Sequence, residues 1–298
     1  MIKVEDIKKI VESIILTGYI KNKDRNPSLF IIAEVESGKT QIIKMFKEYP
    51  NIFMTSDISY KGMVDDIMPK FEDEKISHLL IPDFINPLSH KRACEILIPL
   101  MNSLIEEGVK DLKVFGSKRT FSKTVKGSII SSITKQLFER RIVGWRHSGF
   151  LTRVLPLTFK YSQETIHQIN ESIMKGEYYK QEEKFNKFEG QKLNSIIVNI
   201  NEDIADKISL LADQINRSNK NYILRLFDEN TARMSKVNFD ISTYGFRFHK
   251  LLRTLFQGIA LYNSEDIKIG NIIIEATKKD FEDLVYLTKY LNFNFEEI

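Results

Sequence analysis

The apolar residues change their spacing along the chain, which predicts an alternation of helices and strands. Residues 3–20 carry apolar side chains on one face and charges on the other, the pattern of an amphipathic helix. A second helical pattern spans residues 89–107 and stops at Gly108. Short apolar runs bounded by turn residues instead predict strands at 29–33, 52–55, 76–83, 128–134 and 154–161.

The second half of the chain follows a different pattern. Residues 163–201 are rich in Lys and Glu, which predicts a solvated helix or linker. Two short amphipathic helices are predicted at 204–215 and 221–234. We therefore predict an α/β core over residues 1–160 and a mainly helical region over residues 161–298.

Composition narrows the class of protein. A length of 298 residues allows two domains of common size. Apolar residues make up 42% of the chain and charged residues 28%, the balance of a soluble globular protein. No apolar run is long enough to cross a bilayer, and the first six residues lack the basic start and apolar block of a signal peptide. We therefore expect a cytoplasmic protein with no membrane partner, and the single Cys94 excludes an intramolecular disulfide.

The segment around Gly38-Lys39-Thr40 has the context of a phosphate-binding loop, because a buried strand precedes it and a helical pattern follows. Loop amides would surround an anion, Lys39 would reach the β and γ phosphates, and the Thr40 hydroxyl would bind Mg²⁺. Lys39 is expected to be exposed when no ligand is bound. The motif has Ala33 where its first glycine is usual, and the alternative is an ordinary turn. The predicted contacts to ATP come from six neighbouring residues: Glu36, Ser37, Gly38, Lys39, Thr40 and Gln41.

A carboxylate ends the third predicted strand. Asp83 is expected to hold Mg²⁺ beside the loop, with a turn or helix-capping role as the alternative. Phe84 follows it, where hydrolytic proteins of this type usually have a glutamate that polarises the attacking water. Either another carboxylate has that role, or hydrolysis is slow. The candidate carboxylates are Asp57, Glu34 and Glu36.

Residues 110–127 combine basic charge with a hairpin pattern. Six of these eighteen residues are basic and only Asp111 is acidic. Apolar residues flank Gly116–Thr120, which predicts a β-hairpin with a cationic tip. A solvated loop is the alternative, but we favour contact with a DNA backbone. The predicted DNA-binding residues are Lys113, Lys118, Arg119 and Lys123.

Polar and basic residues also follow the fourth strand. Thr134 ends that strand, and it would either orient the γ-phosphate or attacking water or cap the helix that begins at Lys135. Arg146 and Arg153 lie between this helix and the fifth strand.

The order of these parts resembles that of an AAA+ ATPase, in the branch of the minichromosome-maintenance helicases and MoxR-type chaperones. The matching segments are A-E-V-E-S-G-K-T for Walker A, L-L-I-P-D for Walker B, Thr134 for sensor 1 and G-F-L-T-R for the arginine-finger segment. The hairpin resembles the pre-sensor 1 insertion of that branch. Residues 244–253 resemble the start of a lid helix with Arg247 as the sensor 2 arginine. The likeness covers residues 1–160, and 240–298 more loosely.

The resemblance implies a three-layer P-loop NTPase fold with a five-stranded parallel sheet and a C-terminal helical lid. It also implies a ring of identical subunits that binds ATP and Mg²⁺. Arg153 of one subunit, or Arg146 in its place, would reach the γ-phosphate held by the next subunit. The expected function is an ATPase that couples nucleotide hydrolysis to DNA binding or remodelling. The alternative is a nucleotide-gated switch that hydrolyses little and acts on a protein partner.

Overall fold

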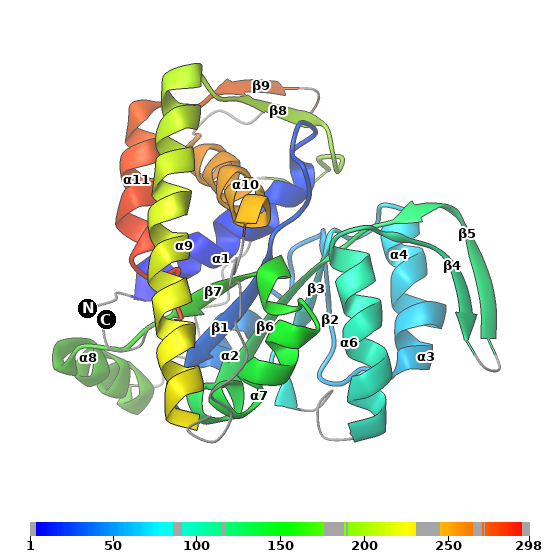
Figure 1. The fold of residues 1–298 in the computed structure, drawn as a ribbon. Helices are drawn as coiled ribbons and strands as arrows, with labels where there is room; N and C mark the ends of the chain where they lie inside the picture. The colour runs from blue at the N-terminus through cyan, green and yellow to red at the C-terminus, as the bar shows by residue number, and fades with distance from the viewer. Residues whose placement is uncertain are drawn as a thin grey trace.

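A five-stranded, all-parallel sheet forms the centre of the molecule in the computed structural model (Figure 1). The structure describes residues 4–85, 91–114, 117–175, 188, 190–230, 245–264, 270 and 272–293. The strand order is β2-β3-β6-β1-β7. The bounds are β1 Ser28–Ala33, β2 Ile52–Met54, β3 His78–Ile81, β6 Ser128–Thr134 and β7 Val154–Thr158. All five predicted strands are therefore confirmed, with shorter bounds in most cases, and the fold is compatible with a three-layer α/β arrangement.

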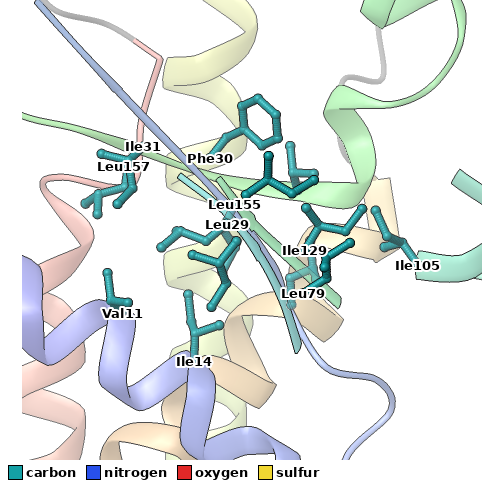
Figure 2. Packing of buried hydrophobic residues seen from close by; sticks show 14 of the residues in the cluster. Val11, Ile14, Leu29, Phe30, Ile31, Leu79, Ile105, Ile129, Leu155 and Leu157 are labelled. Atoms are coloured by element: carbon teal, nitrogen blue, oxygen red, sulfur yellow. The ribbon is translucent and has the colours of Figure 1, made fainter. Parts of the chain in front are cut away.

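Burial on both faces explains why the central strands have continuous apolar runs. All six residues of β1 are buried, as expected for a strand covered on both sides. Figure 2 shows Val11 and Ile14 of α1 (Val4–Leu16) on one side of β1 and Phe30 on the other. Phe30 packs against an aromatic group that includes Phe84 and Trp145, with ring centroids 4.7 and 5.8 Å away. Apolar burial of this kind is the main stabilising term of the sheet.

The helices between the strands lie close to their predicted positions. They are α2 (Lys39–Lys44), α6 (Lys91–Ile105) and α7 (Lys135–His147), and α6 and α7 both lie in front of the sheet in Figure 1. The predicted hairpin is present as β4 (Val109–Val114) and β5 (Ser117–Val125). The sequence reading missed the segment before β3, which forms α3 (Tyr60–Gly62), a π-helical turn (Met63–Ile67) and α4 (Met68–Glu72).

The N-terminal helix packs on the C-terminal region as well as on the sheet. Helix α1 lies beside α10 (Gly245–Asn263), and Gly258 allows the close approach (Figure 1). A Cβ atom built on Gly258 would lie 2.1 Å from the backbone oxygen of Ser13. One hydrophobic cluster accordingly contains residues from both sides of the predicted boundary at residue 160. The boundary itself stays a prediction.

The described part of the C-terminal region consists mostly of helices, and it also contains a small two-stranded sheet. Strand β8 (Ile196–Asn199) pairs in parallel with β9 (Ile272–Glu275), and neither strand was predicted. Helix α8 (Gln163–Met174) is present within the predicted linker, and α11 (Lys278–Thr288) follows β9. The two short helices predicted after residue 201 are wrong as separate elements, because α9 (Glu202–Asn230) is continuous over 29 residues. Residues 231–234 of that prediction lie outside the described part of the chain.

Within the described residues, we find no helix that combines the length and the hydropathy needed to cross a membrane.

Candidate functional site

The segment between β1 and α2 makes a tight turn that only certain residues accept. Gly38 has a φ of 73° and precedes the first residue of α2, so a residue without a Cβ is favoured there. Glu36 also has a positive φ, 61°, although it has a side chain. Helix α2 has only six residues, so its dipole is weak. An anion would therefore depend mainly on the loop amides and on Lys39.

Lys39 is buried, which contradicts the expectation that it is exposed without ligand. Its side chain folds back over the loop, and Nζ donates to the carbonyl oxygen of Glu34 at 2.6 Å and to the Ser37 hydroxyl at 3.3 Å. Burial lowers the pKa of Lys39, and the carboxylates of Asp83 and Glu34 oppose this shift. Asp83 is therefore close enough to Lys39 to influence its charge.

Asp83 and Thr134 lie at the same edge of the sheet as the loop. Asp83 follows β3, two strands from β1 or about 10 Å across the sheet. Its Oδ1 accepts a hydrogen bond from the Ile85 amide at 2.9 Å, as in the predicted alternative of a turn residue. Thr134 ends β6, the strand between them, and is in register with Ala33 of β1. The carboxyl edge of the sheet thus gathers Lys39, Asp83 and Thr134, and it also holds Thr40 and Gln41 in α2.

Phe84 points into the core, which explains why a glutamate is not found at this position. Its amide donates to the Ser132 carbonyl at 2.9 Å, and its side chain is fully buried. The ring stacks on Phe150 with centroids 5.9 Å apart. A carboxylate at position 84 would be desolvated within an aromatic cluster, so this position cannot hold an attacking water.

The other candidate carboxylates remain at the carboxyl edge. Glu34 and Glu36 are exposed on the loop, and Glu34 lies 3.9 Å from Lys135 Nζ. Asp57 follows β2, three strands from β1 or about 14 Å away. Its Oδ1 accepts from the Ile58 amide at 2.7 Å. The geometry therefore favours the two loop glutamates over Asp57 as neighbours of a phosphate.

Two of the predicted arginines lie at the opposite edge of the sheet. Val154 is in register with Ser28, so Arg153 lies at the start of β1 rather than at its end. Arg153 Nε pairs with Glu106 Oε2 at 2.6 Å, and Arg247 Nε pairs with Glu106 Oε1. Arg247 Nη1 also donates to the Thr152 hydroxyl at 3.2 Å.

The length of β1 separates these arginines from the loop by about 17 Å. This separation places Arg247 away from Lys39 of the same chain, and a contact of Arg247 with a nucleotide stays a prediction. The role of Arg153 in a neighbouring subunit stays a prediction, although its side chain is held by Glu106 here. The side chain of Arg146, the other predicted finger, lies outside the described part of the structure.

Sequence reasoning missed Glu106 and Arg25. Arg25 Nη1 lies 3.5 Å from Glu106 Oε1, so three guanidinium groups surround one carboxylate. A signal for Glu106 did exist, because it directly follows α6 and a negative charge at a helix C-terminus is unfavourable without cationic partners. No local pattern in the sequence identifies which arginines supply that charge.

The hairpin is less cationic in the fold than in the sequence. Lys123 Nζ pairs with Glu74 at 2.6 Å, and Arg119 Nη1 lies 3.7 Å from Asp65. Both acids belong to the segment around α4, against which β5 packs. Lys113 and Lys118 face each other in the strand ladder, and their side chains lie outside the described residues. Two of the four predicted DNA contacts are thus already ion-paired.

The comparisons with known proteins add no support to the resemblance to AAA+ ATPases, which depends on the motif residues alone. No family model matches the chain. No curated protein matches it significantly either. Among the described residues, no cluster of three or more His, Cys, Asp or Glu side chains is positioned to hold a metal.

Proposed function

We propose that the loop at 34–40 binds ATP with Mg²⁺ and that the protein is a slow ATPase of the AAA+ type. The observation that carries this proposal is the gathering of Lys39, Asp83 and Thr134 beyond the buried strand that leads into Gly38-Lys39-Thr40. Ligands of open parallel sheets bind outside the carboxyl ends of the strands, which is where these three residues lie.

The residues at this edge fit a magnesium triphosphate. Thr40 and Asp83 supply the hard oxygen ligands that Mg²⁺ prefers. Lys39 would exchange its hydrogen bond to the Glu34 carbonyl for a phosphate oxygen. A bound polyanion would also stabilise the charged form of Lys39, which burial disfavours. Bound Mg²⁺ would supply charge neutralisation between the phosphates.

Hydrolysis is expected to be slow because the position after Asp83 is occupied by a buried ring. Phe84 takes the place of the usual glutamate, and the two loop glutamates are exposed side chains. This feature favours the second candidate function, a nucleotide-gated switch that acts on a protein partner. The rate of phosphate release with and without DNA separates the two functions. DNA-stimulated turnover would support the motor and contradict the switch.

The test of the site uses Lys39→Ala with Lys44→Ala as a matched control. Lys44 is an exposed lysine at the end of the same helix, so its loss changes charge equally. We expect Lys39→Ala to weaken ATP binding by about 100-fold or more, since Lys39 would make charge-assisted hydrogen bonds to two phosphates. Lys44→Ala should bind ATP like the wild type. Equal ATP affinities of the two variants, measured by calorimetry, would show that the loop at 34–40 does not bind ATP.

Assembly and DNA binding belong to the same proposal, supported by the resemblance and by the hairpin. Ion pairs to Asp65 and Glu74 already engage Arg119 and Lys123, so the test of the hairpin uses Lys118. We expect Lys118→Glu to weaken DNA binding and to reduce its salt dependence. Light scattering with and without ATP measures whether a ring forms. A DNA affinity unchanged in Lys118→Glu would show that the hairpin does not contact DNA.

A further inference from the structure

Two adjoining cavities open at the amino edge of the sheet, opposite the proposed nucleotide loop. The larger has a volume of about 310 Å³ and is lined by Tyr19, Asn51, which directly precedes β2, and Lys192, in the turn before β8. The smaller, about 180 Å³, reaches the base of the hairpin at Lys123 and Lys126. Glu74 and Leu193 line both cavities. Together they form a crevice between the sheet, the hairpin and the C-terminal region, which we call the amino-edge crevice.

The walls of this crevice carry an excess of positive charge. Four lysines line the two cavities, Lys75, Lys123, Lys126 and Lys192, against the single carboxylate of Glu74. Lys123 forms an ion pair with Glu74, and Lys75 forms one with Asp73, which lies outside the crevice. Among the described residues, no carboxylate pairs with Lys126 or Lys192. An anionic ligand is therefore favoured over a neutral or cationic one.

Two buried residues that line the larger cavity each carry a polar atom without a hydrogen-bond partner in the described structure. Tyr19 and Asn51 are each 1% exposed, and the Tyr19 hydroxyl and Asn51 Oδ1 are unpaired. The orientation of the Asn51 amide is fixed, because Nδ2 donates to the Ile15 carbonyl and to the Ser77 hydroxyl, both at 2.8 Å. Oδ1 is thus left as an acceptor, while the Tyr19 hydroxyl can donate. Buried unpaired groups are uncommon in folded proteins, and a bound polar ligand would satisfy these two.

The backbone of the crevice is also held in an unusual conformation. Glu74 and Asn194 both have a φ of 54°, and both line the smaller cavity. The Asn194 turn is fastened to the N-terminal region by two backbone bonds, Asn194 N to Gly18 O at 3.2 Å and Ser195 N to Tyr19 O at 2.9 Å. Strained residues held in place by their surroundings are frequent at ligand clamps.

We infer that the amino-edge crevice binds a phosphate-bearing ligand that also carries hydrogen-bond donors, such as a mononucleotide or one nucleotide unit of a nucleic-acid strand. Lys126 and Lys192 would contact the phosphate, the Tyr19 hydroxyl would donate to the ligand, and Asn51 Oδ1 would accept from a ligand hydroxyl or amino group. The volume of the larger cavity lies within the range of small-molecule sites. This site is separate from the loop at Lys39 and does not depend on the proposed ATPase function.

Calorimetric titration of the full chain with AMP, inorganic pyrophosphate and a ten-residue oligothymidylate tests the inference. The titrations use the Lys39→Ala background, so that binding at the proposed ATP loop does not contribute. We expect saturable binding that weakens by about tenfold or more in the double variant Lys126→Glu/Lys192→Glu, since both lysines are exposed and tolerate exchange. Lys207→Glu, an exposed site on α9, is the matched control and should bind normally.

Tyr19→Phe separates a binding role from a structural one. Removal of an unpaired buried hydroxyl should not unfold the protein, so a purely structural residue would leave ligand affinity unchanged. We expect Tyr19→Phe to lose affinity for AMP. Equal 1:1 binding of AMP and the oligonucleotide identifies a small-molecule site, and affinity that rises with strand length identifies a nucleic-acid strand. Failure of all three probes to bind, or binding that survives both the double variant and Tyr19→Phe, overturns the inference.

Discussion

Removal of the Glu106 carboxylate is the sharpest test of how the amino edge of the sheet is held together. Glu106 is the shared partner of Arg25, Arg153 and Arg247. In Glu106→Ala, three guanidinium groups would remain close together with no carboxylate between them. Burial lowers the pKa of Arg25, and Glu106 is the main opposing influence, so the loss of Glu106 leaves a charge that is costly to keep.

The exposure of each arginine sets the expected magnitude. The side chains of Arg25 and Arg153 are 6% and 14% exposed, whereas that of Arg247 is 41% exposed. Removal of one partner from a buried ion pair costs about 3–5 kcal/mol, and an exposed pair contributes about 0–1 kcal/mol. We therefore expect Glu106→Ala to lower the free energy of unfolding by about 3–5 kcal/mol, almost entirely through Arg25 and Arg153. Arg247→Ala should cost about 1 kcal/mol or less.

Urea unfolding followed by tryptophan fluorescence measures this change. Trp145 is the only tryptophan of the chain and is buried in the aromatic cluster, so its emission reports on the core. Glu107→Ala is the matched control, because Glu107 is the adjacent residue and is exposed. A double-mutant cycle of Glu106→Ala with Arg153→Ala isolates the pair. A loss in Glu106→Ala no larger than in Glu107→Ala would refute the reasoning.

Three further predictions concern the packing of two glycines, a buried histidine and position 84. Gly258→Ala should lower the free energy of unfolding by about 1–3 kcal/mol, because the added Cβ would clash with Ser13. Gly144→Ala should raise it by about 0.5–1 kcal/mol, because no atom lies within 4 Å of the added Cβ. Equal shifts of the thermal midpoint in the two variants would contradict this packing. Burial, with Lys23 nearby, lowers the pKa of His78 from 6.5 to about 3. Below pH 6.5 the unfolded chain binds a proton at His78, whereas the folded protein keeps this side chain neutral. The free energy of unfolding should therefore fall by about 1.4 kcal/mol at pH 5.5. A His78→Gln variant, measured by urea unfolding, should lack this part of the pH dependence. Phe84→Glu should lower the unfolding midpoint without raising ATP turnover, and faster phosphate release would show that position 84 faces the nucleotide.

Much of the core was predictable because its signals are local. A strand buried on both faces needs a continuous apolar run, and β1 and β6 show one. The helix after Gly38 and the hairpin before β6 were also evident from residue type and spacing. The parallel five-stranded sheet came only through the resemblance, and no strand order was predicted from the spacing of apolar residues.

The parts that failed depend on contacts between distant segments. Strands β8 and β9 have four residues each and lie 76 positions apart at their starts, so their pairing has no local signature. Helix α9 has a polar middle that divides its apolar stripe, and the sequence reading took it for two helices. Lys39 was expected to be exposed because lysine usually is, but its ammonium group finds the Glu34 carbonyl within the same loop. The role of Glu106 could not be predicted, because its three arginine partners come from three separate regions of the sequence.

The hairpin shows why charge counted along a sequence can mislead about a binding surface. Residues 110–127 have an excess of five positive charges, which is larger than the net charge of +4 for the whole chain. Residues 61–75, which fold against β5, contain five acidic and three basic residues and so remove two of those charges from the shared surface. Ion pairs at 2.6 and 3.7 Å hold Lys123 and Arg119 beside acidic side chains of α4's flanking segments, although both remain partly exposed. Phosphate contacts along this side of the molecule should therefore concentrate at the hairpin tip and in the amino-edge crevice, and substitution of Lys118 should affect DNA binding more than substitution of Arg119.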